Sequence, residues 1–122
     1  MAQISKLVID TKTWARGKRK QITYLLGPDG KQCCLGFLGS ACGIFDDKLE
    51  GAVAPSCVLS EAKSWPAGLI ENVNDYWLRD TPWTDEAVTL NDMDNRKISF
   101  AERTKKLRAH FKKFGIKLIF KK

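Results

Sequence analysis

The sequence contains no run of 18 or more apolar residues, although 43 % of its 122 residues are hydrophobic. A helix needs about 20 consecutive apolar residues to cross a bilayer, so we expect no membrane segment. The first residues, MAQISKLVID, also lack the apolar stretch and the small-residue cleavage site of a secretory signal. A chain of this length has room for one hydrophobic core. The sequence therefore predicts a single domain over residues 1–122 that remains in the cell where it is made.

Signatures of the common enzyme and nucleotide-binding families are also missing. The chain has no GxxxxGK[ST], GxGxxG or HExxH motif, and its single histidine is His110. Such motifs provide phosphate-binding loops or metal ligands, and their absence favours a protein that binds rather than catalyses. We predict that the chain is not an enzyme and that it needs no cofactor.

The four cysteines are Cys33, Cys34, Cys42 and Cys57. Structural zinc sites usually contain C-x2-C pairs, and because that spacing is absent we expect no metal. Without a secretory signal, reduced thiols are expected rather than disulfides. Cys33 or Cys34 could act as a nucleophile at a helix N-terminus if His110 lay beside it. Buried structural cysteines are the commoner case, so thiol catalysis is the least favoured hypothesis.

Charge is distributed unevenly along the chain. Residues 1–32 carry seven Lys and Arg against two acids, residues 33–95 carry three against eleven, and residues 96–122 carry eleven against one. This asymmetry can steer an anionic partner to a basic face. The basic ends can equally attract the acidic middle within the fold, and both interpretations stay open.

Local patterns predict an α+β fold. Residues 4–9 and 21–26 are rich in β-formers, and the segment Gly27-Pro28-Asp29-Gly30 is a turn signal. We expect a small, mostly antiparallel sheet packed with several helices, with a long basic C-terminal helix followed by a short strand. The expected helices cover residues 34–42, a short stretch at 58–65, the stretch that Thr84 caps and the residues after Ser99. A short returning strand is expected at 31–33 after the turn, an ordered loop or a short helix at 71–83, and the last strand at 116–120.

The clearest helical signal follows Ser99. The segment Ser99-Phe100-Ala101-Glu102 fits a capping box, and Gly115 lies where a helix ends. Apolar residues repeat at helical spacing along one side of this segment. The cations of the remaining side are Arg103, Lys105, Lys106, Arg108, Lys112 and Lys113.

Two groups of cations are candidate binding residues. A loop at residues 16–20 has four cations in five positions, and the last helix has six. A tryptophan exposed beside them would stack on a base. Salt-sensitive nucleic-acid binding is therefore the alternative to a protein or nucleotide partner. The residues predicted to bind a ligand or partner are Trp14, Arg16, Lys18, Arg19, Arg103, Lys106 and Lys113.

A separate polar group comprises Asn91, Asp92 and Asp94. These side chains could hold a cation or a hydroxyl-rich ligand, but the further oxygen ligands of a calcium loop are missing. The favoured interpretation is that Asn91 and Asp92 end one helix and fix the next connection through side-chain to backbone hydrogen bonds.

The order of short motifs resembles that of a known protein family. The motifs are Trp14, the Asp29-Gly30 turn, Cys33-Cys34-Leu35-Gly36, the stretch from Trp65 to Gly68-Leu69, Leu90-Asn91-Asp92, and Ser99-Phe100 at the start of the last helix. This order, over about residues 14–114, is similar to that of the small CCLG proteins of tailed bacteriophages. The resemblance implies a compact fold and a phage setting, hence the host cytoplasm, and it implies no catalytic residues.

Many short phage proteins disable host enzymes or immune systems without catalysing a reaction. The resemblance therefore favours a binding protein directed at the host, with an anti-defence role. The expected partner is a host protein that is inhibited or an anionic nucleotide signal that is sequestered. A nucleic-acid-binding accessory protein is the alternative.

Overall fold

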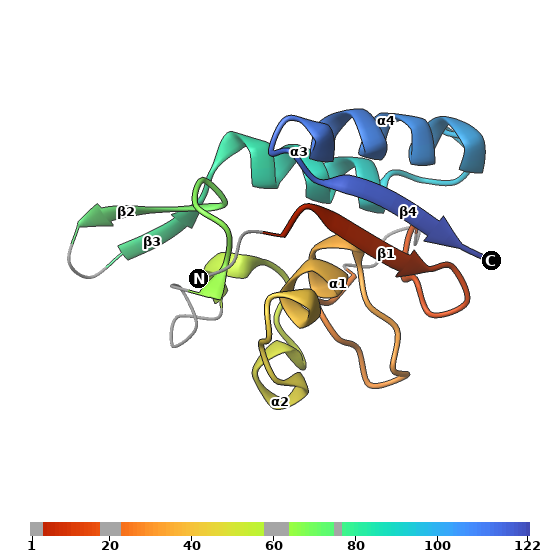
Figure 1. Ribbon diagram of the computed structural model, residues 1–122. Helices are drawn as coiled ribbons and strands as arrows, with labels where there is room; N and C mark the ends of the chain where they lie inside the picture. The colour runs from red at the N-terminus through yellow and green to blue at the C-terminus, as the bar shows by residue number, and fades with distance from the viewer. Residues whose placement is uncertain (1–3, 18–22, 58–63, 75–76) are drawn as a thin grey trace.

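The first and the last strand of the described residues lie side by side (Figure 1). The computed structural model describes residues 4–17, 23–57, 64–74 and 77–122. In chain order its elements are β1 (Lys6–Asp10), α1 (Cys34–Ala41), α2 (Asp46–Leu49), the 3-10 turn η1 (Pro55–Cys57), β2 (Ile70–Asn74), β3 (Trp77–Asp80), α3 (Pro82–Asp92), α4 (Phe100–Lys112) and β4 (Lys117–Lys121).

Strands β1 and β4 form a parallel pair. Leu7 lies opposite Leu118, and Ile9 lies opposite Phe120. Leu7, Ile9 and Leu118 are buried, whereas the paired lysines at the start of each strand are exposed. Because side chains alternate between the faces of a strand, one face of this sheet enters the hydrophobic core.

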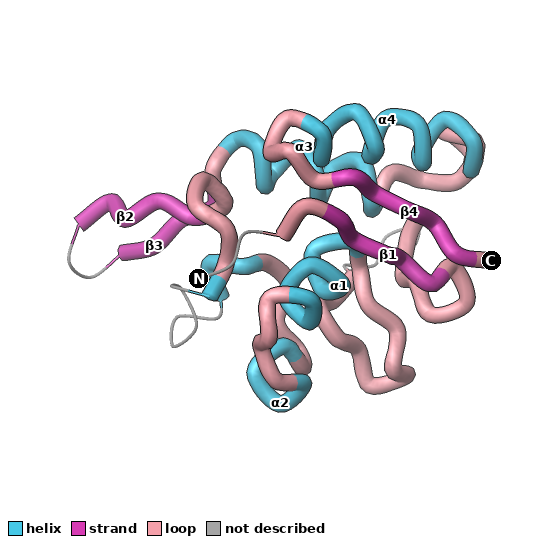
Figure 2. The backbone as a smooth tube through the Cα atoms, viewed as in Figure 1, coloured by secondary structure: helices cyan, strands magenta, loops and turns pink. Residues whose placement is uncertain are grey.

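Three helices pack around this sheet. Helix α4 contacts β4, α1 contacts β1, and α3 contacts both α4 and α1. Figure 2 shows α3 and α4 as a pair on one side of the two strands, with α1 and α2 on the other side of the view. Leu107 and Phe111 of α4 and Leu35 and Leu38 of α1 are fully buried, so the helices meet through apolar side chains.

Helix α4 begins as its sequence predicts. The Ser99 hydroxyl accepts a hydrogen bond from the Glu102 amide at 3.0 Å, which satisfies one of the donors left open at a helix N-terminus. The helix ends at Lys112, and Gly115 has a positive φ of 73° shortly after it. The 13-residue helix carries its cations mostly on the exposed side.

The α+β class is confirmed, but the prediction of one mostly antiparallel sheet is corrected. The described residues form two separate two-stranded sheets, the parallel β1–β4 pair and an antiparallel β2–β3 pair. The hairpin lies at residues 70–80, which the sequence suggested to be loop. At residues 27–30 a hydrogen-bonded turn is present, with Gly30 at φ 80°, but residues 31–33 form no returning strand.

Helix α3 starts earlier than expected. Thr81 rather than Thr84 occupies the N-cap position, and Pro82 is the first helical residue. Proline is tolerated there because its missing N–H needs no partner in the first turn. Thr84 is instead buried and donates its hydroxyl proton to the Leu69 carbonyl at 2.7 Å.

None of the helices in the described part of the chain combines the length and the apolar character needed to span a bilayer.

Candidate functional site

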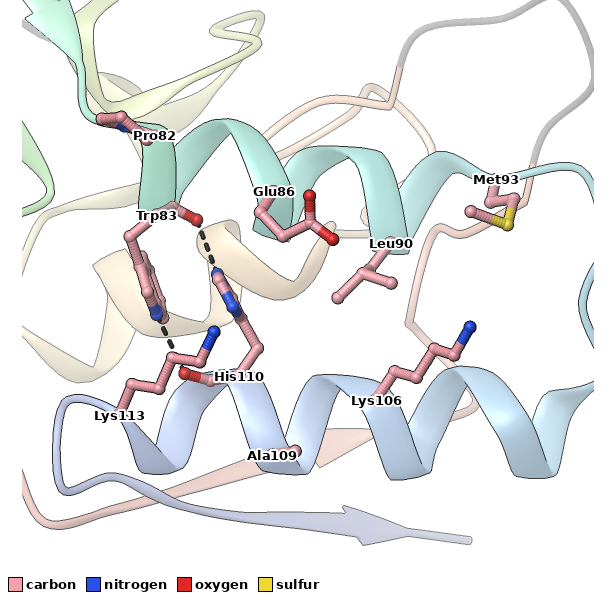
Figure 3. Close-up of a pocket in the computed structure, with 9 residues that line it drawn as sticks. All are labelled: Pro82, Trp83, Glu86, Leu90, Met93, Lys106, Ala109, His110 and Lys113. Atoms are coloured by element: carbon pink, nitrogen blue, oxygen red, sulfur yellow. Dashed lines mark hydrogen bonds between the residues drawn. The ribbon is translucent and has the colours of Figure 1, made fainter.

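A solvent-open groove of about 740 Å³ runs between α3 and α4 (Figure 3). In Figure 3, Glu86 and Leu90 project from α3 toward α4, while Lys106 and Lys113 rise from α4 on either side of Ala109. The lining is mostly apolar. The lining residues are Pro82, Trp83, Glu86, Leu90, Met93, Lys106, Ala109, His110 and Lys113.

One end of the groove is closed by Trp83 and His110. The Trp83 indole N–H donates to the His110 carbonyl at 2.9 Å, and His110 Nε2 donates to the Trp83 carbonyl at 2.7 Å. The two rings are stacked, with centroids 4.5 Å apart and an angle of 9° between their planes. These contacts join the start of α3 to the end of α4 and fix that end of the groove.

The surroundings of His110 favour its neutral form. Burial is the main cause that lowers its pKa from the usual value, and the charge of Lys113 lowers it further. The hydrogen bond to the Trp83 carbonyl and the charge of Glu86 act in the opposite direction and raise it. Since Nε2 carries the hydrogen that bonds to Trp83, Nδ1 is the unprotonated nitrogen of this tautomer.

The charges of the groove are polarised. Lys106 and Lys113, both exposed, lie on the α4 side, and Glu86 lies on the α3 side. Lys106 Nζ is 3.9 Å from a Glu102 carboxylate oxygen one turn earlier on the same helix, a surface pair that contributes little. Lys113 forms no salt bridge with any described residue. The sequence predicted both lysines as binding residues, and the structure brings them to one groove.

Arg103 is not on the surface, contrary to its prediction as a binding residue. It is 1 % exposed. Its guanidinium donates to the carbonyls of Leu90, Asn91 and Met93 at 2.7–2.8 Å and to the Asn95 side chain at 2.8 Å. These carbonyls end α3, where the helix dipole is negative, so Arg103 caps α3 rather than contacting a partner.

Trp14 is also buried, with 3 % of its surface exposed. Its indole N–H donates to Asn91 Oδ1 at 2.8 Å, and the Cys34 amide donates to the same oxygen at 2.9 Å. The Asn91 amide group donates to the Ala15 carbonyl at 3.0 Å and to Asp92. We call these residues the Asn91 cluster. Asn91 lies at the end of α3 and bonds to backbone groups, as predicted, but these belong to Ala15 and Cys34 and not to the connection that follows the helix. The cluster also removes Trp14 from direct contact with a ligand.

Arg16 is half-buried at the edge of the Asn91 cluster. Its guanidinium lies 4.6 Å from the ring centroid of Trp14 and 4.9 Å from that of Phe100. It therefore remains a candidate binding residue. Lys18 and Arg19, the other predicted cations of this loop, lie outside the described residues.

The environment of Cys33 and Cys34 disfavours the nucleophilic role considered for them. Cys33 and Cys34 are buried, and burial raises the pKa of the Cys33 thiol to about 11 and that of Cys34 well above its usual value. A thiol needs the opposite shift to be a nucleophile near neutral pH. His110 bonds to Trp83 instead. Among the described residues no group of three His, Cys, Asp or Glu could hold a metal ion.

Several groove residues were not singled out from the sequence. Trp83, Glu86, Leu90 and Met93 repeat at spacings of three and four, the period of one helix face. A groove also needs a second helix with a matching face, which Lys106, Ala109 and Lys113 provide. That two such faces meet is a tertiary property, so their periodicity alone could not identify a site.

Comparison with known proteins adds no assignment, because no protein-family model, curated protein or solved structure matches this chain.

Proposed function

We propose that this chain is a non-catalytic phage protein that binds an acidic segment of a host protein in the α3–α4 groove and thereby counters a host defence. The observation that carries the proposal is the polarised groove, with an apolar floor and two exposed lysines on one rim. The phage and anti-defence parts rest on the motif resemblance, and the acidic nature of the partner rests on charge.

The spacing of the lysines suits a helical occupant. Lys106 and Lys113 are seven residues apart, about 10 Å along the helix axis at 1.5 Å per residue. An amphipathic helix with acids seven residues apart would match both lysines while its apolar side chains cover Leu90 and Ala109. Helix-in-groove recognition of this kind combines apolar anchors with complementary charge.

Glu86 gives the groove a direction. It opposes the two lysines from α3 and would repel an acid placed on that side. An occupant is therefore expected to turn its acids toward α4. The excess of Lys and Arg over acids, 21 against 14, would also speed the encounter with an acidic partner.

The proposal is tested by purifying the tagged chain from infected host cells and quantifying its protein partners. Lys106→Glu/Lys113→Glu should lose a partner that the wild type binds in stoichiometric amount. The matched control is Lys31→Glu/Lys48→Glu, which makes the same charge change at exposed residues outside α3 and α4 and should keep the partner. A partner retained by the groove variant, or the lack of any stoichiometric partner, would refute the proposal.

The anti-defence role has a separate readout. A phage without this gene should form fewer plaques on a host that carries the defence, and equal numbers on a host from which the defence is deleted. The wild type and the Lys31→Glu/Lys48→Glu control should restore plating, whereas Lys106→Glu/Lys113→Glu should not. Restoration by the groove variant would show that the groove has no part in the phenotype.

A further inference from the structure

A second surface combines residues of α4 and β4 with Arg16, and none of them lines the groove. The Arg16 guanidinium carbon lies over the rings of Trp14 (4.6 Å) and Phe100 (4.9 Å), and that of Arg108 lies 5.2 Å from the Phe120 ring centroid. The Trp14 ring connects the two pairs, with centroid distances of 6.1 Å to Phe100 and 5.0 Å to Phe120. We call Arg16, Phe100, Arg108 and Phe120 the Arg16–Phe100 surface.

This surface presents aromatic area to solvent on a fixed base. Phe100 is 45 % exposed, and Phe120 is half-buried. Trp14 beneath them is buried and bonded through its indole N–H to Asn91. A rigid exposed ring is suited to stack on a flat ligand, because stacking then costs little side-chain entropy.

The two arginines of the surface are not neutralised by the described part of the protein. Arg16 has one weak hydrogen bond, from Nη1 to the Trp14 carbonyl at 3.4 Å, and neither Arg16 nor Arg108 forms a salt bridge with a described carboxylate. Burial lowers the pKa of Arg16. The pKa of Arg103 is lowered by burial first and by the charge of Arg16 second, while Asp92 opposes the shift. An anion at Arg16 would relieve this repulsion between the two guanidinium groups.

We propose that the Arg16–Phe100 surface binds a phosphorylated nucleoside, with the base stacked on Phe100 and the phosphate held by Arg16 and Arg108. Guanidinium groups match phosphate oxygens with paired N–H donors. Bases stack on aromatic side chains regardless of sequence. A free nucleotide and the 5′ end of a single strand share this chemistry. The proposal does not depend on the groove or its partner.

The test is titration calorimetry of the whole chain with ADP, with inorganic phosphate and with a 5′-phosphorylated oligothymidylate. ADP should bind saturably, and Arg16→Gln and Phe100→Ala should each weaken it by about tenfold, given the usual contribution of one stacked base or charged hydrogen bond. The matched control Lys105→Gln removes an exposed cation of α4 outside this surface. It should change the affinity by no more than about twofold, as expected for a distant screened charge.

Phe100→Tyr keeps the ring and guards against misfolding of the alanine variant; it should retain binding. Tighter binding of the oligothymidylate than of ADP would identify a strand as the source, and the reverse would identify a free nucleotide. The proposal is overturned if neither ADP nor the oligothymidylate binds saturably at millimolar concentration. It is also overturned if inorganic phosphate binds as well as ADP, or if Lys105→Gln weakens binding as much as Arg16→Gln.

Discussion

At the scale of single residues, Asn91 connects sequence motifs that lie far apart in the chain. One side-chain amide receives hydrogen bonds from Trp14 and Cys34 and donates one to Ala15. Asn91 is 1 % exposed, so no solvent can replace these partners. Three of the motifs that carry the resemblance, those of Trp14, Cys34 and Asn91, therefore meet at one buried amide, which holds Trp14 and the start of α1 in place.

Replacement of Asn91 by alanine should destabilise the fold by roughly 3 kcal/mol or more, because two buried donors lose their acceptor and each costs about 1–3 kcal/mol. Urea unfolding followed by circular dichroism measures this change. Thr89→Ala is the control on the same helix, since Thr89 is exposed, and should stay within about 0.5 kcal/mol. Equal losses of unfolding free energy in the two variants would mean that the hydrogen bonds of the Asn91 cluster do not stabilise the fold.

The exposed and the buried thiols should separate into two classes, with the half-buried Cys42, whose pKa burial raises, between them. Cys57 is exposed, whereas Cys33 and Cys34 are buried, with the pKa of Cys33 raised to about 11 by burial. A thiol reagent at pH 8 should label Cys57 rapidly and should label Cys33 and Cys34 only after unfolding. Cys57→Ser identifies the fast phase. Rapid labelling that persists in Cys57→Ser and maps to Cys33 would contradict the buried, unreactive assignment.

At the scale of elements, Gly36 determines how closely α1 approaches the chain before it. A Cβ atom at Gly36 would lie 1.9 Å from the carbonyl oxygen of Leu25. Gly36→Ala should therefore destabilise the fold by more than about 2 kcal/mol, as overpacking against backbone does, although alanine favours helix by about 1 kcal/mol. Ala101→Gly, at an exposed site in α4, measures the propensity effect alone. A stabilised Gly36→Ala would disprove the close approach.

The Trp83–His110 contact between α3 and α4 should make stability depend on pH. Because the pKa of His110 is lowered in the folded state, the unfolded chain binds the proton more readily below the usual value of about 6.5. The stability that neutral His110 contributes is therefore fully present above the pKa of the unfolded chain. It is lost as the pH falls from there through the lower pKa of the folded state. Urea unfolding at pH 7.5 and pH 5 should show a larger loss for wild type than for His110→Gln, which does not titrate. An equal loss in both would exclude His110 as the cause.

At the scale of the whole molecule, the sequence predicted those features that depend only on residues close together in the chain. The cap at Ser99 and the turn at Gly30 were predicted because the partners involved lie within three residues. The parallel pairing of β1 with β4 was missed because it joins residues about 110 positions apart, and strand propensity carries no information on direction.

Arg103 was assigned to the wrong face for a related reason. It lies one turn before the fully buried Leu107, but a cation at such a position is usually solvated. Only the packing of α3 against α4 brings the carbonyls of Leu90 and Asn91 within reach of its guanidinium. The groove depends on the same packing of α3 against α4. Its lysines could therefore be predicted from the sequence, but the pairing of the two helix faces that line it could not.

The pairing of β4 with β1 should be required for folding. Truncation after Gly115 removes the buried side chains of Ile116 and Leu118 and leaves β1 without its partner. Losing each such side chain costs about 2–5 kcal/mol, against a total stability of about 5–15 kcal/mol for a domain. The truncated chain should therefore show no cooperative thermal transition by circular dichroism.

The control for that truncation removes only Lys122, which follows β4 and is exposed. It leaves intact the hydrogen bond from the Thr11 amide to the Lys121 carbonyl at 2.8 Å, so its transition should match that of the full chain. A synthetic peptide of residues 116–122, added to the truncated chain, should restore the transition, and its midpoint should rise with the peptide concentration. A truncated chain that unfolds cooperatively without the peptide would show that the α1, α3 and α4 core is stable without the parallel sheet.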